Sequence, residues 1–473
     1  MVVAGAAGFV GRALVPVLVR EHEVVALSRS LRGQERGVEW RGCDLFSLLQ
    51  TDEALQGADV GIYLVHSMLP ARLTQASFAD MDLILADNFA RSAARAGLRQ
   101  IIYLGGLVPE GVELSRHLAS RLEVERVLGA RGVPVTSLRA GLIVGAGGSS
   151  FRMMIGLVSR LPVMICPKWT TTRTQPVGLA DVTALLAFCV GREETFGRSF
   201  DIGASETMSY VEMMRRVGEG MGRVPRIVTV PFLSPRLSVA WICLVTGARR
   251  ELVRPLVESL RHEMICRNQE LARLAGRDPQ GFEVALAEAL AGEKADRKSR
   301  KEWKDHLGRV GSGWREPGYV VSIQRLPLPR GRDAQWVARE YARWLPGLLR
   351  HVIRVTVDGE SNLTFWLSGV RVPLLILRFS AERSTSDRPL FYLEGGWLVR
   401  GGQTRNGRRP ARLEFRSTPD ARHVMAAVFN YRPRLPWWIY RFTQAPIHLA
   451  VMRLFGRHLK AVEARASLAM ANG

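Results

Sequence analysis

The 473-residue sequence predicts an α/β domain built on a doubly wound parallel sheet, followed by a smaller α+β domain. Up to about residue 200, short β-branched runs alternate with helical segments, which is the order that a parallel sheet with crossover helices requires. A mixed-charge stretch then leads into closely spaced glycines, which is typical of a linker. We therefore expect a first domain at 1–291, a linker at 292–312 and a second domain at 313–473.

The first domain contains six candidate strands rich in Val, Ile and Leu. They lie at residues 2–3, 24–27, 38–40, 60–65, 101–104 and 135–138. Between the fourth and the fifth strand, residues 78–96 predict a helix whose apolar residues recur at intervals of about four, so that one face can pack on the sheet. These apolar residues are Met81, Leu85, Phe89 and Ala93.

The second domain has a different rhythm. It is predicted to contain a strand (319–326), a helix (333–349), four strand-like runs between 353 and 415, a fifth run at 424–429 and a terminal helix. A curved antiparallel sheet wrapped on a long C-terminal helix fits this order, with either an apolar ligand cavity or a filled core beneath it. Residues Trp437–Tyr440 either line such a cavity, touch a membrane surface or form a packed helix face, and packing is the preferred reading.

Composition limits the class of protein. With 47% hydrophobic and 23% charged residues, the chain is not of the disordered or fibrous type. The net charge of +22 favours acidic partners, but the arginines are dispersed and no nucleic-acid-binding motif accompanies them, so we expect no specific nucleic acid. The oligomeric state is left open.

The sequence also suggests a compartment. The most apolar stretch, residues 239–245, is too short to span a bilayer, so only peripheral membrane contact is considered. No export signal precedes the first strand, and the five cysteines are far apart, without the spacing of a metal site or a disulfide framework. We expect a cytoplasmic protein without a metal site.

A glycine-rich loop joins the first strand to the first helix. Its sequence G-x-x-G-x-x-G lets the backbone approach a pyrophosphate, whose charge then rests on the helix N-terminus. The preceding strand, the following apolar helix and the second strand are all in register with it, which predicts a Rossmann dinucleotide site, although Pro16 should cost the helix a hydrogen bond or kink it. The loop residues expected at the cofactor are Gly5, Ala7, Gly8, Phe9, Val10 and Gly11.

The end of the second strand indicates which dinucleotide is bound. An NAD-binding domain usually places a carboxylate here, whereas this chain has Ser28, Arg29 and Arg32. A cation suits a 2′-phosphate, so Arg29 is the first choice for that contact and NADP(H) is expected rather than NAD(H). The alternative is that these are solvated loop residues.

Several further motifs follow in a recognisable order. They are Asp44-Leu45, Tyr63-Leu64-Val65-His66-Ser67, Tyr103-Leu104-Gly105-Gly106 and Leu138-Arg139-Ala140-Gly141. Together with the glycine loop they resemble the atypical short-chain dehydrogenase/reductases, and the segment 115–124 resembles their nucleoside-diphosphate-sugar-epimerase-like, NmrA-like subgroup. The resemblance implies cofactor contacts from Asp44, Leu45, Val65, His66, Gly105, Gly106, Arg139, Ala140 and Gly141. The segment 313–318 and the strand order after it resemble an added domain similar to helix-grip, START-like folds.

The chain departs from that family at its catalytic positions. The family's Tyr-x-x-x-Lys pair is replaced by His117 and Arg121, and its serine by Gly105-Gly106. The spacing still places His117 and Arg121 on one helical face, where an imidazole that titrates near neutrality can act as acid or base. Arg121 can hold the nicotinamide ribose or a substrate anion, and Ser67 can replace the missing serine. The alternative is that His117 and Arg121 only cap and solvate the helix.

Three functions remain open at this point. The leading one is an NADP(H)-dependent oxidoreductase acting on an apolar carbonyl or alkene, with the second domain holding or shielding the substrate. The second is an inactive NADP(H)-sensing regulator or assembly factor. The third, a sugar-nucleotide epimerase, ranks low because the Tyr-x-x-x-Lys pair is missing.

Overall fold

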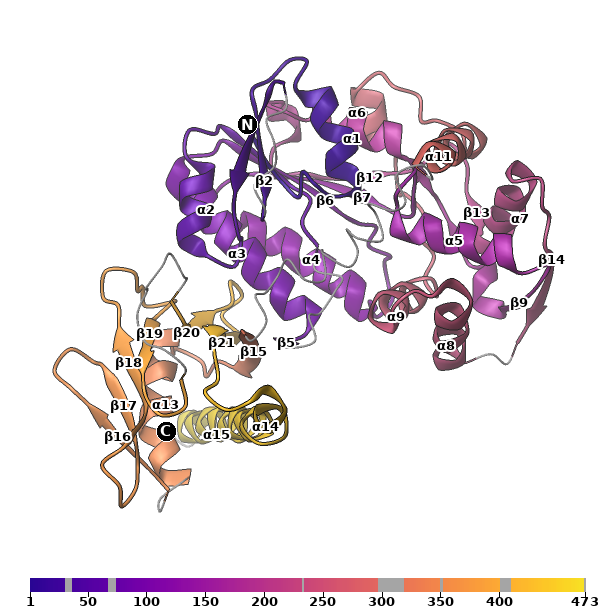
Figure 1. The fold of residues 1–473 in the computed structure, drawn as a ribbon. Coiled ribbons are helices and arrows are strands. Elements are labelled where there is room, and N and C mark those ends of the chain that lie inside the picture. Colours follow the sequence, from indigo (N-terminus) through magenta and orange to yellow (C-terminus); the bar gives the residue numbers. More distant parts are fainter. Residues whose placement is uncertain are drawn as a thin grey trace. The chain divides into compact units, whose positions relative to one another are not determined.

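The chain divides into two compact units (Figure 1). Unit 1 comprises residues 1–69 and 82–311, and unit 2 comprises residues 70–81 and 312–473. The computed structural model describes residues 1–29, 36–66, 74–231, 234–296, 319–348, 352–399 and 410–471. Most of the predicted linker at 292–312 lies outside the described residues, so the predicted domain boundary stays a prediction.

Unit 1 is built on a seven-stranded sheet in which every neighbouring pair is parallel. The strand order is β3-β2-β1-β4-β6-β7-β12, so the winding reverses between β1 and β4. The strands are β1 (Val2–Ala4), β2 (Val24–Ser28), β3 (Val38–Gly42), β4 (Val60–Tyr63), β6 (Gln100–Gly106), β7 (Val135–Ala140) and β12 (Ser199–Ile202). All six predicted strands are present, which confirms the doubly wound Rossmann fold, and β12 extends the sheet beyond the prediction.

Helices cover both faces of this sheet (Figure 1). They are α1 (Phe9–Leu18), α2 (Leu48–Leu55), α3 (Phe78–Ala96), α4 (Arg116–Gly129) and α6 (Leu179–Phe188). The helices α1 and α6 pack together on one face, while α3 and α4 lie on the other. Pro16 lies inside α1 without ending it.

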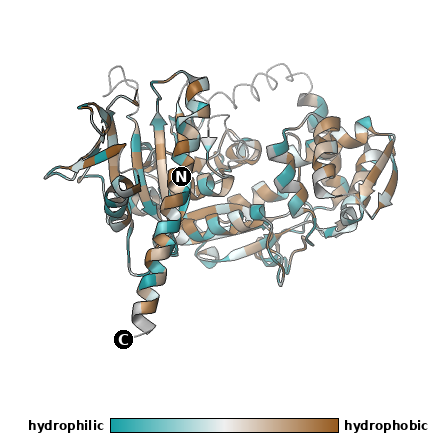
Figure 2. Ribbon diagram, turned by 90° about the horizontal axis from the view of Figure 1, so that it is seen from below, coloured by the Kyte–Doolittle hydropathy of each residue, from teal (hydrophilic) through white to brown (hydrophobic). Residues whose placement is uncertain are grey.

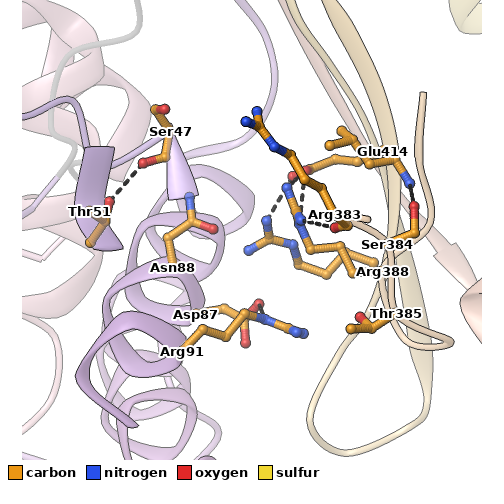
Figure 3. A network of polar contacts seen from close by, with 12 residues as sticks. Ser47, Thr51, Asp87, Asn88, Arg91, Arg383, Ser384, Thr385, Arg388 and Glu414 are labelled. Atoms are coloured by element: carbon orange, nitrogen blue, oxygen red, sulfur yellow. Dashed lines mark hydrogen bonds and ion pairs between the residues drawn. The ribbon is translucent and has the colours of Figure 1, made fainter. Parts of the chain in front are cut away.

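The predicted apolar face of α3 is buried, since Met81, Leu85, Phe89 and Ala93 are each at most 4% exposed. The same helix also buries polar residues. Asp87 and Arg91 form an ion pair at 2.7 Å, one helical turn apart (Figure 3). An apolar residue at every fourth position predicts the buried face of the helix but not a buried ion pair.

The rest of unit 1 consists of short strand pairs and helices. The pairs are β8 (Ile143–Val144) with β11 (Val177–Gly178), β9 (Val163–Pro167) with β14 (Arg226–Val230), and β10 (Arg173–Thr174) with β13 (Met208–Ser209). The helices are α5 (Ser149–Arg160), α7 (Tyr210–Gly220), α8 (Pro235–Thr246), α9 (Arg250–Ser259), α10 (Glu270–Leu274) and α11 (Phe282–Asp296). The apolar stretch 239–245 lies in α8, and across the described ranges no helix combines the length and apolarity that crossing a bilayer requires.

Unit 2 contains an eight-stranded sheet with the order β16-β17-β18-β19-β20-β21-β15-β5. Its elements are β5 (Thr74–Gln75), β15 (Val320–Pro327), α13 (Ala334–Leu348), β16 (Ile353–Val357), β17 (Leu363–Leu367), β18 (Pro373–Phe379), β19 (Leu390–Gly395), β20 (Arg412–Ser417), β21 (His423–Tyr431), α14 (Trp437–Phe442) and α15 (Gln444–Ala471). All pairs are antiparallel except β15 with β5. The α+β order is confirmed. The predicted number of strands is wrong by one, because five strands rather than four lie between Ile353 and Ser417.

The core of unit 2 is formed by the sheet together with α13 and α15. It also buries charge. Glu414 on β20 is fully buried and binds Arg388 at 2.8 Å and Arg416 at 2.8 Å (Figure 3 shows the contact with Arg388). Burial tends to raise the pKa of Glu414, but the guanidinium groups of Arg388, Arg416 and Arg412 outweigh it and lower that pKa to about 2.

Candidate functional site

The glycine loop at the end of β1 has the geometry of a pyrophosphate cradle. Gly5 has φ +88°, which favours glycine, and a Cβ at Gly11 would lie 2.4 Å from the Gly5 carbonyl oxygen. Gly8 precedes α1 and offers no capping side chain, and the first turn of α1 carries no acidic residue. The first N–H groups of α1 therefore point to an anion site, which fits a dinucleotide at the switch point between β1 and β4.

The other predicted loop residues contribute in different ways. Ala7 offers its carbonyl oxygen, which accepts a hydrogen bond from Arg12 Nε at 3.0 Å. Phe9 is half-buried, and a Cβ at Gly148 would lie 3.0 Å from its ring, so the ring packs on the loop after β8. Val10 packs against the core. Arg12, one residue after the last loop glycine, was not among the predicted residues, and its contact with Ala7 ties the start of α1 to the loop.

The adenosine end lies at the carboxyl ends of β2 and β3. Ser28 ends β2, and Arg29 follows it with an exposed side chain. Partial desolvation lowers the pKa of Arg29, and the carboxylate of Asp44 counteracts this, so the two side chains interact electrostatically. Predicted residue Arg32 lies outside the described residues. A cation and a carboxylate thus meet where the sequence predicts the 2′-phosphate and the adenine.

The Asp44-Leu45 loop is firmly held. Asp44 Oδ1 accepts from the backbone N–H of Phe46 at 3.2 Å. The buried Asn88 side chain on α3 donates to the Leu45 carbonyl oxygen at 2.7 Å. The loop is therefore fixed before any ligand binds, as preorganised binding requires.

A cluster of polar side chains occupies the space between the ends of β4 and β6. His66, after β4, and His117, on α4, have ring centroids 5.2 Å apart. Asp82 on α3 accepts from His66 Nδ1 at 2.9 Å. Because a carboxylate only accepts, this places the proton of neutral His66 on Nδ1 and leaves Nε2 as an acceptor, which is buried and has no partner among the described residues.

Burial changes what the two histidines can do. Desolvation lowers the pKa of His117 to about 3, and Arg121 and His66 add to the effect. The expectation that His117 titrates near neutrality is therefore wrong. Desolvation and Arg121 also lower the pKa of His66, against the influence of Asp82. At neutral pH both rings are neutral, so each can donate and accept hydrogen bonds but brings no charge.

Arg121 lies one helical turn after His117, as the spacing predicts. Its backbone carbonyl accepts from the Tyr103 hydroxyl at 3.2 Å, and its side chain is half-buried. A Cβ at Gly105 would lie 2.9 Å from the Tyr103 ring, whereas one at Gly106 would lie 3.5 Å from Leu118. A serine at position 105 would thus require Tyr103 to move, which explains why glycine stands there. Ser67, the proposed substitute, lies outside the described residues.

The remaining predicted cofactor residues differ in outcome. The Arg139 side chain donates two hydrogen bonds to Glu125, at 3.0 Å and 2.6 Å. It is thus held in an ion pair, whereas the sequence predicted it at the nicotinamide end. Val65 is half-buried beside His66. Ala140 and Gly141, by contrast, line a cavity.

This cavity lies within unit 1 and has a volume of about 640 Å³. Gly106, His117, Ala140 and Gly141 line it at the sheet edge. Most of the remaining lining is apolar and comes from α5, α7, α8, α9 and β9; it includes Met153, Met154, Leu157, Met164, Met214, Trp241 and Val257. The sequence suggested an apolar cavity in the second domain and missed this one, because its wall is assembled from segments far apart in the chain.

The parallel sheet, its switch point and the glycine loop define unit 1 as an NAD(P)-binding Rossmann domain. Residues 1–111 match the NAD dependent epimerase/dehydratase family. The auxiliary protein GraX of Staphylococcus aureus is 30% identical over 141 residues, which are 28% of this chain and 42% of that protein. The match therefore spans less than half of the length of this relative.

Solved structures similar to the chain include three enzymes. A nucleoside-diphosphate-sugar epimerase from Staphylococcus aureus is 16% identical, with a TM-score of 0.49 over 60% of this chain and 99% of its own. An NADPH-dependent quinone oxidoreductase from Escherichia coli, complexed with NADPH, is 17% identical, with a TM-score of 0.49 over 60% and 98%. A triphenylmethane reductase from Citrobacter sp., complexed with NADP(H), is 16% identical, with a TM-score of 0.48 over 61% and 99%.

Proposed function

We propose that the chain is an NADP(H)-dependent oxidoreductase that acts on an apolar carbonyl or alkene. One observation carries this proposal. The apolar cavity of about 640 Å³ reaches the carboxyl edge of the sheet at His117, whose ring lies 5.2 Å from the ring of His66. A cavity of this size accommodates a mid-sized ligand, and its end at the sheet edge is where a nicotinamide lies in this fold.

The preference for NADP(H) rests on Arg29. A guanidinium at the end of β2 provides the charge that a 2′-phosphate requires, while the usual acidic residue is absent from this position in the sequence. The first turn of α1 would hold the pyrophosphate, and the fixed Asp44-Leu45 loop would hold the adenine. When bound, the reduced nicotinamide supplies a hydride.

Side chains of the protein would polarise the carbonyl group that accepts the hydride. Neutral His117 would donate a hydrogen bond to a carbonyl oxygen in the cavity, and Arg121 would stabilise the negative charge that develops there. Asp82 fixes the tautomer of His66, so that Nε2 would accept a hydrogen bond from a water beside His117. The second proton of that water would pass to the substrate oxygen as it gains negative charge, and exchange with solvent would replace it. The apolar walls would exclude water and strengthen each of these interactions.

The second domain is proposed to be a helix-grip-like domain. In unit 2, β15 is followed by α13, six antiparallel strands and the long helix α15, with β15 closing against β21. This order supports the predicted similarity to helix-grip, START-like folds. Its proposed role is to hold or shield the substrate.

A second candidate function is an NADP(H)-sensing regulator without turnover. Two observations favour it. The pKa of His117 is too low for this residue to act as a charged acid near neutral pH. Gly105 and Gly106 supply no hydroxyl group where the family has its serine. The cofactor site is the same in both cases, so the two functions differ only in turnover.

Activity measurements distinguish the two. Purified full-length protein would be incubated with NADPH and a panel of apolar ketones, aldehydes, enones and quinones, with nucleotide sugars as the polar comparison. The proposal predicts NADPH consumption with at least one apolar compound. Leu157→Trp, which fills the cavity, should reduce that rate about tenfold or more while NADPH affinity is retained. Leu274→Trp, at an exposed position of α10, is the control.

The outcomes separate the hypotheses clearly. NADPH binding without consumption of any compound would favour the regulator. Turnover of nucleotide sugars alone would favour an epimerase or dehydratase. Equal effects of Leu157→Trp and Leu274→Trp would show that the cavity does not hold the substrate.

A further inference from the structure

The cavity opens beneath helix α8, and its rim is strongly apolar. Leu237, Trp241 and Leu244 recur at the spacing of one helix face, and each of them also lines the cavity. Although they border an apolar hollow, they are 60%, 48% and 77% exposed. The outer face of α8 is therefore both the wall of the cavity and part of the molecular surface.

The β9–β14 ribbon continues this apolar surface. Val163 and Ile165 on β9 and Val228 on β14 are exposed, and Val228 pairs with Ile165 in the ribbon. Ile165 also lines the cavity, which connects the ribbon to the α8 rim. We call these six residues (Val163, Ile165, Val228, Leu237, Trp241 and Leu244) the cavity mouth. Figure 2 shows hydrophobic residues concentrated at this end of unit 1, on the right of the view.

The two chain segments that carry the cavity mouth are basic, with Glu251 directly after the second of them. Residues 141–180 contain four basic and no acidic residues, and residues 221–250 contain five arginines and no acidic residue. These two segments carry the whole cavity mouth. Lys168, Arg226, Arg249 and Arg250 are exposed, and Arg226 pairs directly with Val163 in the ribbon. Further along α9, Glu258 is bound to Arg254 at 2.8 Å.

We propose that the cavity mouth docks on an anionic lipid bilayer and that the cavity takes its substrate from the lipid. Exposed Trp and Leu side chains insert into the interfacial region, and flanking Lys and Arg side chains bind anionic headgroups. A monomer rarely leaves a contiguous apolar patch in water without a partner. A hollow patch with basic surroundings matches a lipid surface better than the flat, self-complementary patch that a second copy needs.

This inference narrows the substrate class and in that respect depends on the proposed function. It specifies a hydride acceptor that partitions into membranes, such as a compound with a long hydrocarbon portion. Such a molecule can pass from the bilayer to His117 without crossing water. Docking itself does not require turnover, so it can be tested separately.

The test is vesicle flotation of the full-length protein. Vesicles of phosphatidylcholine alone are compared with vesicles that also contain phosphatidylglycerol, at low and high salt. We expect the protein to float with the anionic vesicles and to dissociate as salt increases. The double variant Trp241→Ser/Leu244→Ser should bind them about tenfold or more weakly, because both apolar anchors are lost. Trp397→Ser is the matched control, since Trp397 is 50% exposed in unit 2 and Trp241 is 48% exposed.

NADPH titration of all three proteins keeps the two proposals distinguishable. Unchanged NADPH affinity shows that the double variant is folded. Any loss of flotation is then caused by the two substitutions in the cavity mouth. The docking proposal fails if the wild type does not float with anionic vesicles, or if the double variant floats as well as Trp397→Ser. It also fails if light scattering shows a wild-type dimer that the double variant abolishes, because a second copy then covers the patch.

Discussion

Replacing Arg29 with alanine tests the assignment of the cofactor. A hydrogen bond to a charged group contributes about 1.5–3 kcal/mol. Arg29 is exposed at the end of β2, so solvent screens its charge and the lower value applies. The predicted loss of about 1.5 kcal/mol corresponds to a roughly tenfold weaker affinity for NADPH. Affinity for NADH, which lacks the 2′-phosphate, should change less than about twofold.

Isothermal titration of both dinucleotides at one fixed ionic strength measures the difference. Arg20→Ala is the control, because Arg20 is also exposed and lies beyond the other end of α1. If Arg29→Ala leaves NADPH affinity unchanged, the 2′-phosphate is not bound at this position. If both variants weaken NADPH binding equally, the effect comes from overall charge.

Three further predictions concern the loop, the polar cluster and unit 2. Gly11→Ala should weaken NADPH binding at least about tenfold and destabilise the fold by about 1–3 kcal/mol, because the new Cβ would lie 2.4 Å from the carbonyl oxygen of Gly5. Titration with NADPH and thermal unfolding measure these two effects. Unchanged NADPH binding would contradict the loop geometry. In the wild type, the Asp82 carboxylate orients His66 and raises the pKa of that histidine. Asp82→Asn removes both effects, so kcat should fall while the Kd of NADPH stays the same. An unaltered kcat would exclude His66 from the mechanism. The pKa of Glu414 is about 2 in the folded protein and about 4.5 in the unfolded chain. At a pH above about 4.5, ionised Glu414 therefore contributes about 3 kcal/mol to the free energy of unfolding, and this contribution is lost as the pH falls from about 4.5 to 2. Glu414→Gln should therefore lower stability at neutral pH and weaken this acid dependence in urea titrations, and equal stability of both proteins at neutral pH would contradict the buried network.

The sequence was most informative where the structure depends on local signals. Parallel strands are buried on both faces and therefore appear as short β-branched runs, which located all six predicted strands of unit 1. Strand β5 shows the limit of this approach. Its two residues, Thr74 and Gln75, pair with residues of β15 that lie 247 positions later in the sequence, and no local pattern marks such a strand.

The candidate site divides in the same way. The glycine loop follows from its spacing and its flanking elements, and the pair of His117 and Arg121 follows from its position in the resembled family's motif. The contact of His66 with Asp82 depends on how α3 packs, and the low pKa of His117 depends on burial, so neither can be deduced from neighbouring residues. Most of the apolar wall of the cavity comes from five separate elements, and its apolar residues are indistinguishable in sequence from ordinary core residues.

The central claim is that the cavity beside His117 receives a hydride acceptor from NADP(H). The most direct measurement uses NADPH deuterated at the transferable position of the nicotinamide, together with the best apolar acceptor, and locates the label in the product by mass spectrometry. We expect the deuterium on the carbon that was reduced, with transfer lost in Leu157→Trp and retained in Leu274→Trp. Product that forms without the label, or transfer that Leu157→Trp leaves intact, would contradict this assignment of the site.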